Sequence, residues 1–285
     1  MKFDWNKWKE KRSERKNTLQ VFITNKCNLE CKGCFARKII GGNRTDMELS
    51  EYKQAVENFI SKEGEKINLL GGEPLLHPQL KEILRHNSSK NLSTTIYTNG
   101  YYLGEYNKED LENAKLRASI YSYNEGIKSA TNLPLTEAPL DTCYMVSSNT
   151  KLESLLKSAE HMEKNYDCNV FFISSIRELD NERKEFFDDT DLTMPLIEYK
   201  ELVHKFLEEY EGNMEIHVSK RGVFESTLNT GSNKCKFSNY FIGGQIIQCP
   251  YDIVNSRFQE DYSFDNRYCQ QNNSCLMTKV IFERK

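Results

Sequence analysis

The chain has 285 residues and a formal net charge of −3, with 38% hydrophobic and 28% charged residues. This composition excludes an intrinsically disordered chain, and the acidic balance argues against a nucleic-acid partner. No apolar run reaches the length of a membrane span, and the charged first 16 residues lack the apolar core of a secretion signal. We therefore expect a cytoplasmic protein with no membrane partner.

Short apolar segments alternate with helical patterns along the first part of the chain. The predicted strands are 18–24, 67–70, 94–98, 116–121, 142–146 and 169–173, and the predicted helices are 50–62, 79–86, 108–114 and 152–164. Alternation of this kind indicates an α/β fold with a parallel sheet. Functional residues are then expected in the loops that follow the strands.

The pattern changes after a polar stretch at 181–190. A helix is predicted at 196–211, followed by short strands at 215–218, 239–242 and 245–248. The last two strands are joined at Gly243-Gly244, which is typical of a hairpin. We therefore divide the chain into a charged segment (1–17), an α/β domain (18–212) and a small C-terminal domain (213–285).

The nine cysteines carry most of the functional information. In a reducing compartment they favour metal sites or reactive thiols over disulfides. Cys27, Cys31 and Cys34 follow the first predicted strand with CxxxCxxC spacing. Three thiolates can hold a [4Fe–4S] cluster and leave one iron open to another ligand. A zinc knuckle that lacks its fourth ligand, or incidental cysteines, are the alternatives.

Two motifs, CNLECKGC and LLGGEPLLHP, occur in the order in which the radical S-adenosylmethionine (SAM) family has them, and the chain resembles that family. The resemblance implies a partial (β/α)6 barrel in which Cys27, Cys31 and Cys34 hold a [4Fe–4S] cluster that binds SAM. The methionine amino group would be lined by Gly71, Gly72, Glu73 and Pro74. The two glycines would let backbone carbonyls approach an ammonium, and Glu73 would add a charge-assisted hydrogen bond.

The remaining SAM contacts are assigned by the same resemblance. The residue before the third cysteine is often aromatic in the family, but here it is Gly33, so Phe35 is the candidate for adenine packing. Packing beneath the loop is the alternative for Phe35. The candidates for ribose contacts are Asn99, Ser119 and Ser122, with Ser122 ranked first. Arg177 could pair with the SAM carboxylate or be a surface arginine.

Four further cysteines, Cys235, Cys249, Cys269 and Cys275, lie in the C-terminal domain. The stretch from Cys235 through Gly244 to Cys249 resembles the start of the SPASM and twitch extensions of radical SAM enzymes. The resemblance implies a twitch-like domain with one auxiliary [4Fe–4S] cluster held by these four thiols. Structural zinc is the alternative, because four thiolates suit it equally well.

Cys143 and Cys168 remain. Cys143 lies in a predicted strand whose alternate residues face the barrel interior, where its thiol could donate a hydrogen atom to a substrate radical. Packing in the core is the alternative, because free cysteine is among the most buried residues. We assign no role to Cys168.

The resemblance implies that SAM is cleaved reductively to a 5′-deoxyadenosyl radical, with electrons from a flavodoxin- or ferredoxin-type donor. The radical would abstract hydrogen from a small polar or peptide substrate, giving oxidation, cross-linking or epimerisation. Because about 17 residues precede the first strand, we expect no leader-binding domain ahead of the barrel.

Three alternative functions stay open. The first is a glycyl-radical-enzyme activase, which the Gly-Cys-Phe sequence at 33–35 resembles. The second is an RNA-modifying radical SAM enzyme that uses the basic N-terminal segment, although such a segment is usually a solvated charged helix. The third is a metal-binding or electron-transfer scaffold without chemistry of its own.

Overall fold

A computed structural model describes residues 7–11, 16–31, 34, 36, 44–111, 114–121, 133–176, 192–219, 237–244, 246–247 and 279–285. The chain forms two compact units, which we describe separately. The cysteine-loop unit comprises Arg15–Arg117 and Ser232–Cys269. The second unit comprises Met1–Glu14, Ala118–Gly231 and Gln270–Lys285.

The cysteine-loop unit is built on a mixed sheet with a fully buried strand, β2 (Thr18–Thr24). β2 pairs in parallel with β3 (Lys66–Gly71), which pairs in parallel with β4 (Ser93–Thr98). On its other side β2 pairs in parallel with β9 (Phe237–Tyr240), and β10 (Ile246–Ile247) returns antiparallel to β9. The predicted hairpin is therefore confirmed, and it adds to the sheet next to β2.

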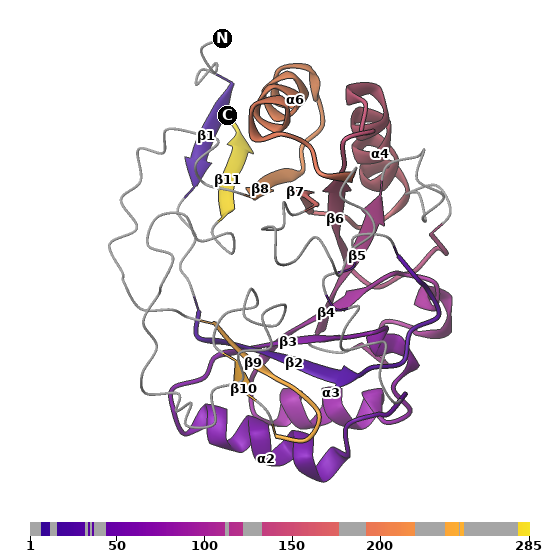
Figure 1. Ribbon diagram of the computed structural model, residues 1–285, viewed down its shortest axis with the longest axis vertical. Helices are drawn as coiled ribbons and strands as arrows, with labels where there is room; N and C mark the ends of the chain where they lie inside the picture. The colour runs from indigo at the N-terminus through magenta and orange to yellow at the C-terminus, as the bar shows by residue number, and fades with distance from the viewer. Residues whose placement is uncertain are drawn as a thin grey trace. The chain divides into compact units, whose positions relative to one another are not determined.

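Two helices cover one face of this sheet. Figure 1 shows α2 (Leu49–Ile60) and α3 (Leu80–Ser89) side by side below β2 and β3. Their apolar faces bury Ala55, Val56 and Phe59 of α2 and Ile83 and Leu84 of α3. Since side chains alternate along a strand, every second side chain of the sheet points to the face opposite α2 and α3. Two short 3-10 helices, η1 (Pro74–Leu76) and η2 (Leu103–Glu105), follow β3 and β4.

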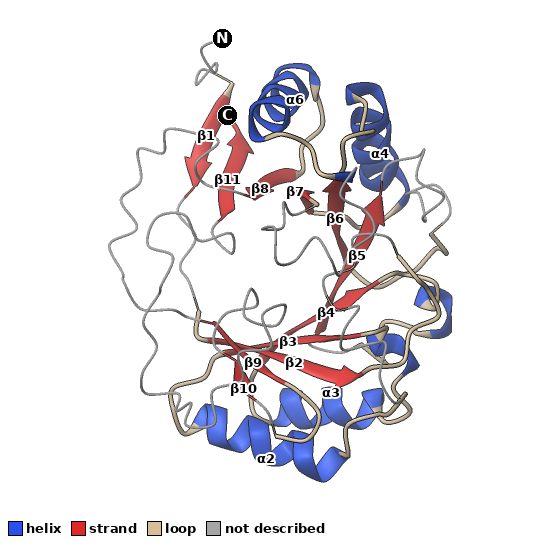
Figure 2. Ribbon diagram, in the orientation of Figure 1, coloured by secondary structure: helices blue, strands red, loops and turns tan. Residues whose placement is uncertain are grey.

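The second unit has the same parallel construction. Its parallel strands are β6 (Leu140–Val146), β7 (Val170–Ser175) and β8 (Glu215–Ser219). Two helices, α4 (Leu152–Asn165) and α6 (Leu196–Glu209), lie beside these strands (Figure 2). Phe171 of β7 stacks on Phe206 of α6, which stacks on Tyr210. β11 (Lys279–Arg284) pairs antiparallel with β8 and with β1 (Trp8–Lys11). β5 (Ala114–Tyr121) contains the boundary between the units.

The predicted strands and most predicted helices are confirmed, with ends shifted by a few residues. The predicted helix at 108–114 is wrong, because 108–111 form turns and β5 begins at Ala114. Asn107 and Asp110 make the reciprocal side-chain-to-backbone hydrogen bonds that are typical of a helix start. The backbone bonds that follow, from Leu111 to Lys108 and from Ala114 to Leu111, span three residues, so the segment forms turns before β5.

The charged N-terminal segment contains a strand where a solvated helix was the expectation. Trp8 of β1 is 2% exposed, donates its indole N–H to the carbonyl of Leu207 at 2.8 Å, and packs edge-on against Phe282. The charged residues that follow Trp8 give no strand periodicity, so the sequence pattern did not reveal this strand. The predicted boundary near residue 213 stays a prediction.

Candidate functional site

The cysteine loop begins where β2 ends, and its first residues are held by polar contacts. Thr24 donates its hydroxyl to Asp46 Oδ1 at 2.6 Å and accepts the backbone N–H of Lys26 at 3.1 Å. The Lys26 ammonium pairs with Asp46 Oδ2. Burial acts to raise the pKa of Asp46, but the hydrogen bonds from Lys26 and Thr24 outweigh it and lower that pKa. The carboxylate therefore stays charged and fixes the loop's start.

Cys27, Cys31 and Cys34 are half-buried on this loop. The backbone N–H of Cys34 donates to the carbonyl of Cys31 at 3.4 Å, which closes a turn between them. Cys34 packs on an apolar floor made by Phe22, Ala36, Leu70 and Phe241, with Tyr97 beside it. The Phe22 and Phe241 rings stack with centroids 4.4 Å apart. Cys34 thus packs on apolar side chains, one of which, Phe241, comes from the C-terminal hairpin.

The chemistry of the donor set fits a [4Fe–4S] cluster. Within the described ranges, no three His, Cys, Asp or Glu side chains lie close enough to share one metal ion. A cluster does not require that convergence, because each cysteine ligates its own iron. Cys27 Sγ accepts the backbone N–H of Leu29 at 3.4 Å and lies 4.0 Å from Asn99 Nδ2. Such donors surround metal-ligating side chains in proteins.

The Gly71-Gly72-Glu73 turn is locked to the start of the cysteine loop. Backbone N–H groups of Gly72 and Glu73 donate to the carbonyls of Thr24 and Lys26, each at 2.8 Å. A Cβ on Gly71 would lie 2.2 Å from the Thr24 carbonyl oxygen, and one on Gly72 would lie 2.1 Å from that of Lys26. The two glycines are therefore required for the approach of two backbone segments, a role that the sequence analysis missed.

The Glu73 side chain is 0% exposed and lies at the centre of a hydrogen-bond network. Its Oε1 accepts the backbone N–H of Leu75 at 3.0 Å and the hydroxyl of Thr98 at 2.7 Å. Its Oε2 accepts the backbone N–H of Asn99 at 2.7 Å. These bonds hold the carboxylate between η1 and the end of β4. The predicted contact of Glu73 with the SAM amino group stays a prediction.

Pro74, the fourth residue of the predicted amino-group lining, has a clear local role. It opens η1, where its missing N–H removes a donor that would have no helical partner, and its carbonyl accepts the N–H of His77 at 3.0 Å. The side chain is buried. Pro74 therefore shapes the turn that presents Glu73.

Asn99, predicted as a ribose contact, lies beside the cysteine loop. Its Oδ1 accepts the backbone N–H of Tyr101 at 3.0 Å, and its Nδ2 donates to Asn28 Oδ1 at 2.8 Å. The same Nδ2 is the atom that faces Cys27 Sγ. The structure thus brings Asn99, Glu73 and Cys27 together.

Several predicted site residues lie outside the described residues. They are Phe35, Ser122, Arg177, and the four C-terminal cysteines Cys235, Cys249, Cys269 and Cys275. Ser119 is half-buried on β5. The roles assigned to all of these residues stay predictions.

His77 ends the GGEPLLH segment and was missed by the sequence analysis. Its Nδ1 accepts the backbone N–H of Gln79 at 3.1 Å, so its Nε2 carries the hydrogen and donates to the carbonyl of Met47 at 3.0 Å. Burial lowers the pKa of His77, which keeps the ring neutral. The segment after β3 is thereby tied to the residues that precede α2. A histidine beside the Gly-Gly-Glu-Pro turn was the available signal.

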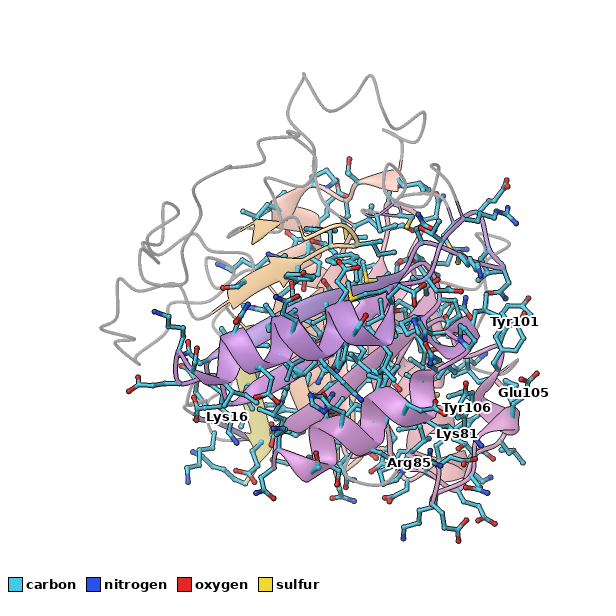
Figure 3. All side chains as sticks on the ribbon, turned by 90° about the horizontal axis from the view of Figure 1, so that it is seen from below. Lys16, Lys81, Arg85, Tyr101, Glu105 and Tyr106 are labelled. Atoms are coloured by element: carbon cyan, nitrogen blue, oxygen red, sulfur yellow. The ribbon has the colours of Figure 1, made fainter. Side chains whose placement is uncertain are left out.

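Tyr106 supports the same turn from the loop after β4. Its hydroxyl donates to the carbonyl of Leu75 at 2.9 Å, and the Lys81 ammonium lies 5.9 Å from the centre of its ring (Figure 3). Burial raises the pKa of Tyr106, so the hydroxyl keeps its proton and remains a donor.

Cys143 lies in the second unit on the face of β6 that points away from α6. It is paired across the sheet with Phe172, whereas the preceding Phe171 packs on Phe206 of α6. Cys143 is 7% exposed, and its sulfur is 3.8 Å from that of Met145. Its predicted hydrogen-donor role stays a prediction. Burial raises the pKa of Cys168 to about 11.

Comparison with protein families identifies the domain that carries the cysteine loop. Residues 21–135 match the model of the radical SAM superfamily, and this range includes the three cysteines, Glu73 and Asn99. The chain carries a radical SAM domain. The superfamily implies SAM and a [4Fe–4S] cluster, and the assignment of Cys27, Cys31 and Cys34 as the cluster ligands stays a prediction.

Curated relatives of this radical SAM domain align over part of the chain. An S-adenosylmethionine-dependent nucleotide dehydratase from Selenomonas ruminantium is 34% identical over 29% of this chain and 29% of its own length. A GTP 3′,8-cyclase from Helicobacter pylori is 25% identical over 65% of this chain and 56% of its own length. The chain therefore spans about a third to somewhat over half of the relatives it matches.

Solved radical SAM structures show the same fold over most of the chain. SuiB from Streptococcus suis superposes with a TM-score of 0.68 at 15% identity, covering 90% of this chain and 66% of SuiB. Native anSMEcpe with bound AdoMet gives 0.59 at 16% identity, covering 88% of this chain and 76% of that one. The predicted α/β class and open partial barrel are confirmed. No helix in the described ranges is long and apolar enough to cross a membrane.

Proposed function

We propose that this protein cleaves SAM reductively and uses the resulting 5′-deoxyadenosyl radical to abstract hydrogen from a small polar or peptide substrate. The proposal rests on the contact between the cysteine loop and the Gly71-Gly72-Glu73 turn. Two backbone hydrogen bonds of 2.8 Å join these two motifs. When bound, the cluster would supply the electron that breaks the sulfonium bond. Cys27, Cys31 and Cys34 would be its ligands.

The chain's own residues orient the reactants and exclude water. The apolar floor of Phe22, Leu70 and Phe241 keeps water from below the loop, which protects a radical from side reactions. The negative charge of Glu73 would favour the ammonium of the SAM methionine. Thr98 and Asn99 hold the Glu73 carboxylate in place through bonds of 2.7 Å.

For the outcome of the reaction we propose oxidation, cross-linking or epimerisation. Cys235, Cys249, Cys269 and Cys275 would hold an auxiliary [4Fe–4S] cluster, which can accept an electron from a substrate radical and make the net reaction an oxidation. Iron analysis of anaerobically purified protein tests this part. About eight irons per chain supports two clusters, whereas about four with bound zinc contradicts the auxiliary one.

A peptide substrate is the first candidate. Solved structures with this fold include SuiB bound to precursor peptide SuiA and anSMEcpe with the Kp18Cys peptide. The second candidate is a purine nucleotide, which the names of the curated relatives favour, namely nucleotide dehydratase and GTP 3′,8-cyclase. Either substrate would be used with a flavodoxin- or ferredoxin-type electron donor.

The test is a substrate panel with reconstituted enzyme, SAM and a low-potential reductant. The expected result is 5′-deoxyadenosine formation that rises when a peptide is added and gives a peptide product altered at a C–H bond. A rise with GTP and not with any peptide would replace the first candidate with the second. No rise with either class would contradict both.

A further inference from the structure

Asn99 occupies a defined place between the Glu73 network and the sulfur of Cys27. Its backbone N–H is held by Glu73 Oε2 at 2.7 Å, so its main chain cannot shift without breaking a bond to a buried carboxylate. Its side chain reaches across to the cysteine loop, where Nδ2 lies 4.0 Å from Cys27 Sγ. Asn99 is separated from Cys27 by 72 positions in the sequence.

The orientation of the Asn99 amide follows from its partners. The backbone N–H of Tyr101 can only donate, so the atom that faces it at 3.0 Å must be the carbonyl oxygen of the side chain. The NH2 group then points the other way, toward Asn28 Oδ1 at 2.8 Å and Cys27 Sγ. A flipped amide would set two donors against each other at Tyr101. The group presented to the sulfur is therefore a hydrogen-bond donor.

A second donor acts on the same sulfur. The backbone N–H of Leu29 lies 3.4 Å from Cys27 Sγ, which is a normal distance for a bond to sulfur. The hydrogen bonds that a cluster's sulfurs receive help to set its reduction potential. The reduced cluster carries one more negative charge, and a donor stabilises that state more than the oxidised one. Each such donor therefore raises the potential.

From this geometry we propose that Asn99 is a positioning residue that sets the reduction potential of the cluster through its hydrogen bond to Cys27. The inference rests on the proposed function, because it requires the cluster held by Cys27, Cys31 and Cys34. Glu73 contributes indirectly, since it holds the backbone from which the Asn99 side chain extends. The sequence analysis assigned Asn99 to the ribose, and that assignment stays a prediction.

The test is a redox titration of reconstituted protein, followed by the electron paramagnetic resonance signal that changes when SAM is added. Asn99→Ala removes the donor and should lower the midpoint potential. Asn99→Asp keeps the size and the acceptor for Tyr101 but turns a negative oxygen toward the sulfur, so it should lower the potential further. Asn58→Asp makes the same change on the exposed face of α2 and should leave the potential as in the wild type.

The outcomes separate this inference from the proposed function. Wild-type protein without a SAM-sensitive signal would contradict the proposed function itself. A wild-type signal, with the potential unchanged in an Asn99 variant that holds its full iron, would overturn the role of Asn99. Loss of iron from both Asn99 variants while Asn58→Asp retains it would also overturn that role, because Asn99 would then be needed to form the loop.

Discussion

Glu73 and Thr98 are joined by a hydrogen bond of 2.7 Å although 25 positions separate them in the sequence. The bond links the turn after β3 to the end of β4, and both side chains are buried. The network that follows, from Glu73 to Asn99 and on to Cys27, connects both sequence motifs.

Glu73→Gln should destabilise the protein by about 1–3 kcal/mol. The carboxylate accepts three hydrogen bonds on its two oxygens, and an amide must turn an NH2 group toward at least one of those donors. Urea unfolding at neutral pH measures the loss. Thr98→Val removes the hydroxyl that donates to Glu73 and accepts the backbone N–H of Gly100 at 2.9 Å, and it should also cost about 1–3 kcal/mol. Equal stability of Glu73→Gln and wild type would contradict the network.

Gly72→Ala should cost about 1–3 kcal/mol or more and reduce iron uptake. Its Cβ would lie 2.1 Å from the carbonyl oxygen of Lys26, so the cysteine loop has to move. Gly243→Ala is the control, because nothing lies within 4 Å of its added Cβ. Gly243 has a φ of +86°, so backbone strain alone should cost the control about 1–2 kcal/mol. Iron uptake should persist in the control, and normal uptake in Gly72→Ala would refute the steric argument.

Because His77 is neutral in the folded protein, the free energy of unfolding should decrease in acid. Its pKa is lowered in the folded protein, so the unfolded chain binds the proton more tightly. The free energy of unfolding therefore rises with pH between the lowered pKa of the folded protein and the ordinary pKa of about 6.5. The contribution is complete above that value and is lost as the pH falls through the window. Unfolding free energies at about pH 5.5 and about pH 7.5 measure it.

His77→Gln should show a smaller difference between the two pH values than the wild type, because its side chain does not titrate. The pKa values of His86 and His204 are also lowered by burial, so they contribute equally to both proteins and cancel in the comparison. An identical pH dependence of the unfolding free energy in wild type and variant would show that His77 does not contribute to it.

Cys143→Ala should retain SAM cleavage but lose normal substrate turnover, because a hydrogen donor would be missing. The measurement is 5′-deoxyadenosine and product formation in the same reaction, analysed by mass spectrometry. Cys168→Ala is the matched control in the same unit, since burial raises the pKa of Cys168 to about 11 and the thiol contacts Thr142 and Val170. Turnover equal to that of the wild type would indicate that Cys143 only packs in the core.

The sequence predicted most of the strand and helix order, because this order depends on local periodicity, and the role of the three cysteines stays a prediction. It could not predict that Gly71 and Gly72 serve the approach of the Thr24 and Lys26 backbones, since that contact exists only after β2 and β3 pair. The contribution of Phe241 to the floor under Cys34 is equally non-local. The turn at 108–111 was missed because Asn107 and Asp110 make the bonds of a helix start, yet the chain enters β5 at Ala114.

The most direct test of the central claim is 5′-deoxyadenosine formation by anaerobically reconstituted protein supplied with SAM and dithionite. The wild type should form 5′-deoxyadenosine well above the no-enzyme background. Cys31→Ala should form none above that background, because the cluster would lose a ligand from the CxxxCxxC loop. Equal formation by Cys31→Ala and wild type, or none by wild type that carries iron and sulfide, would contradict the account.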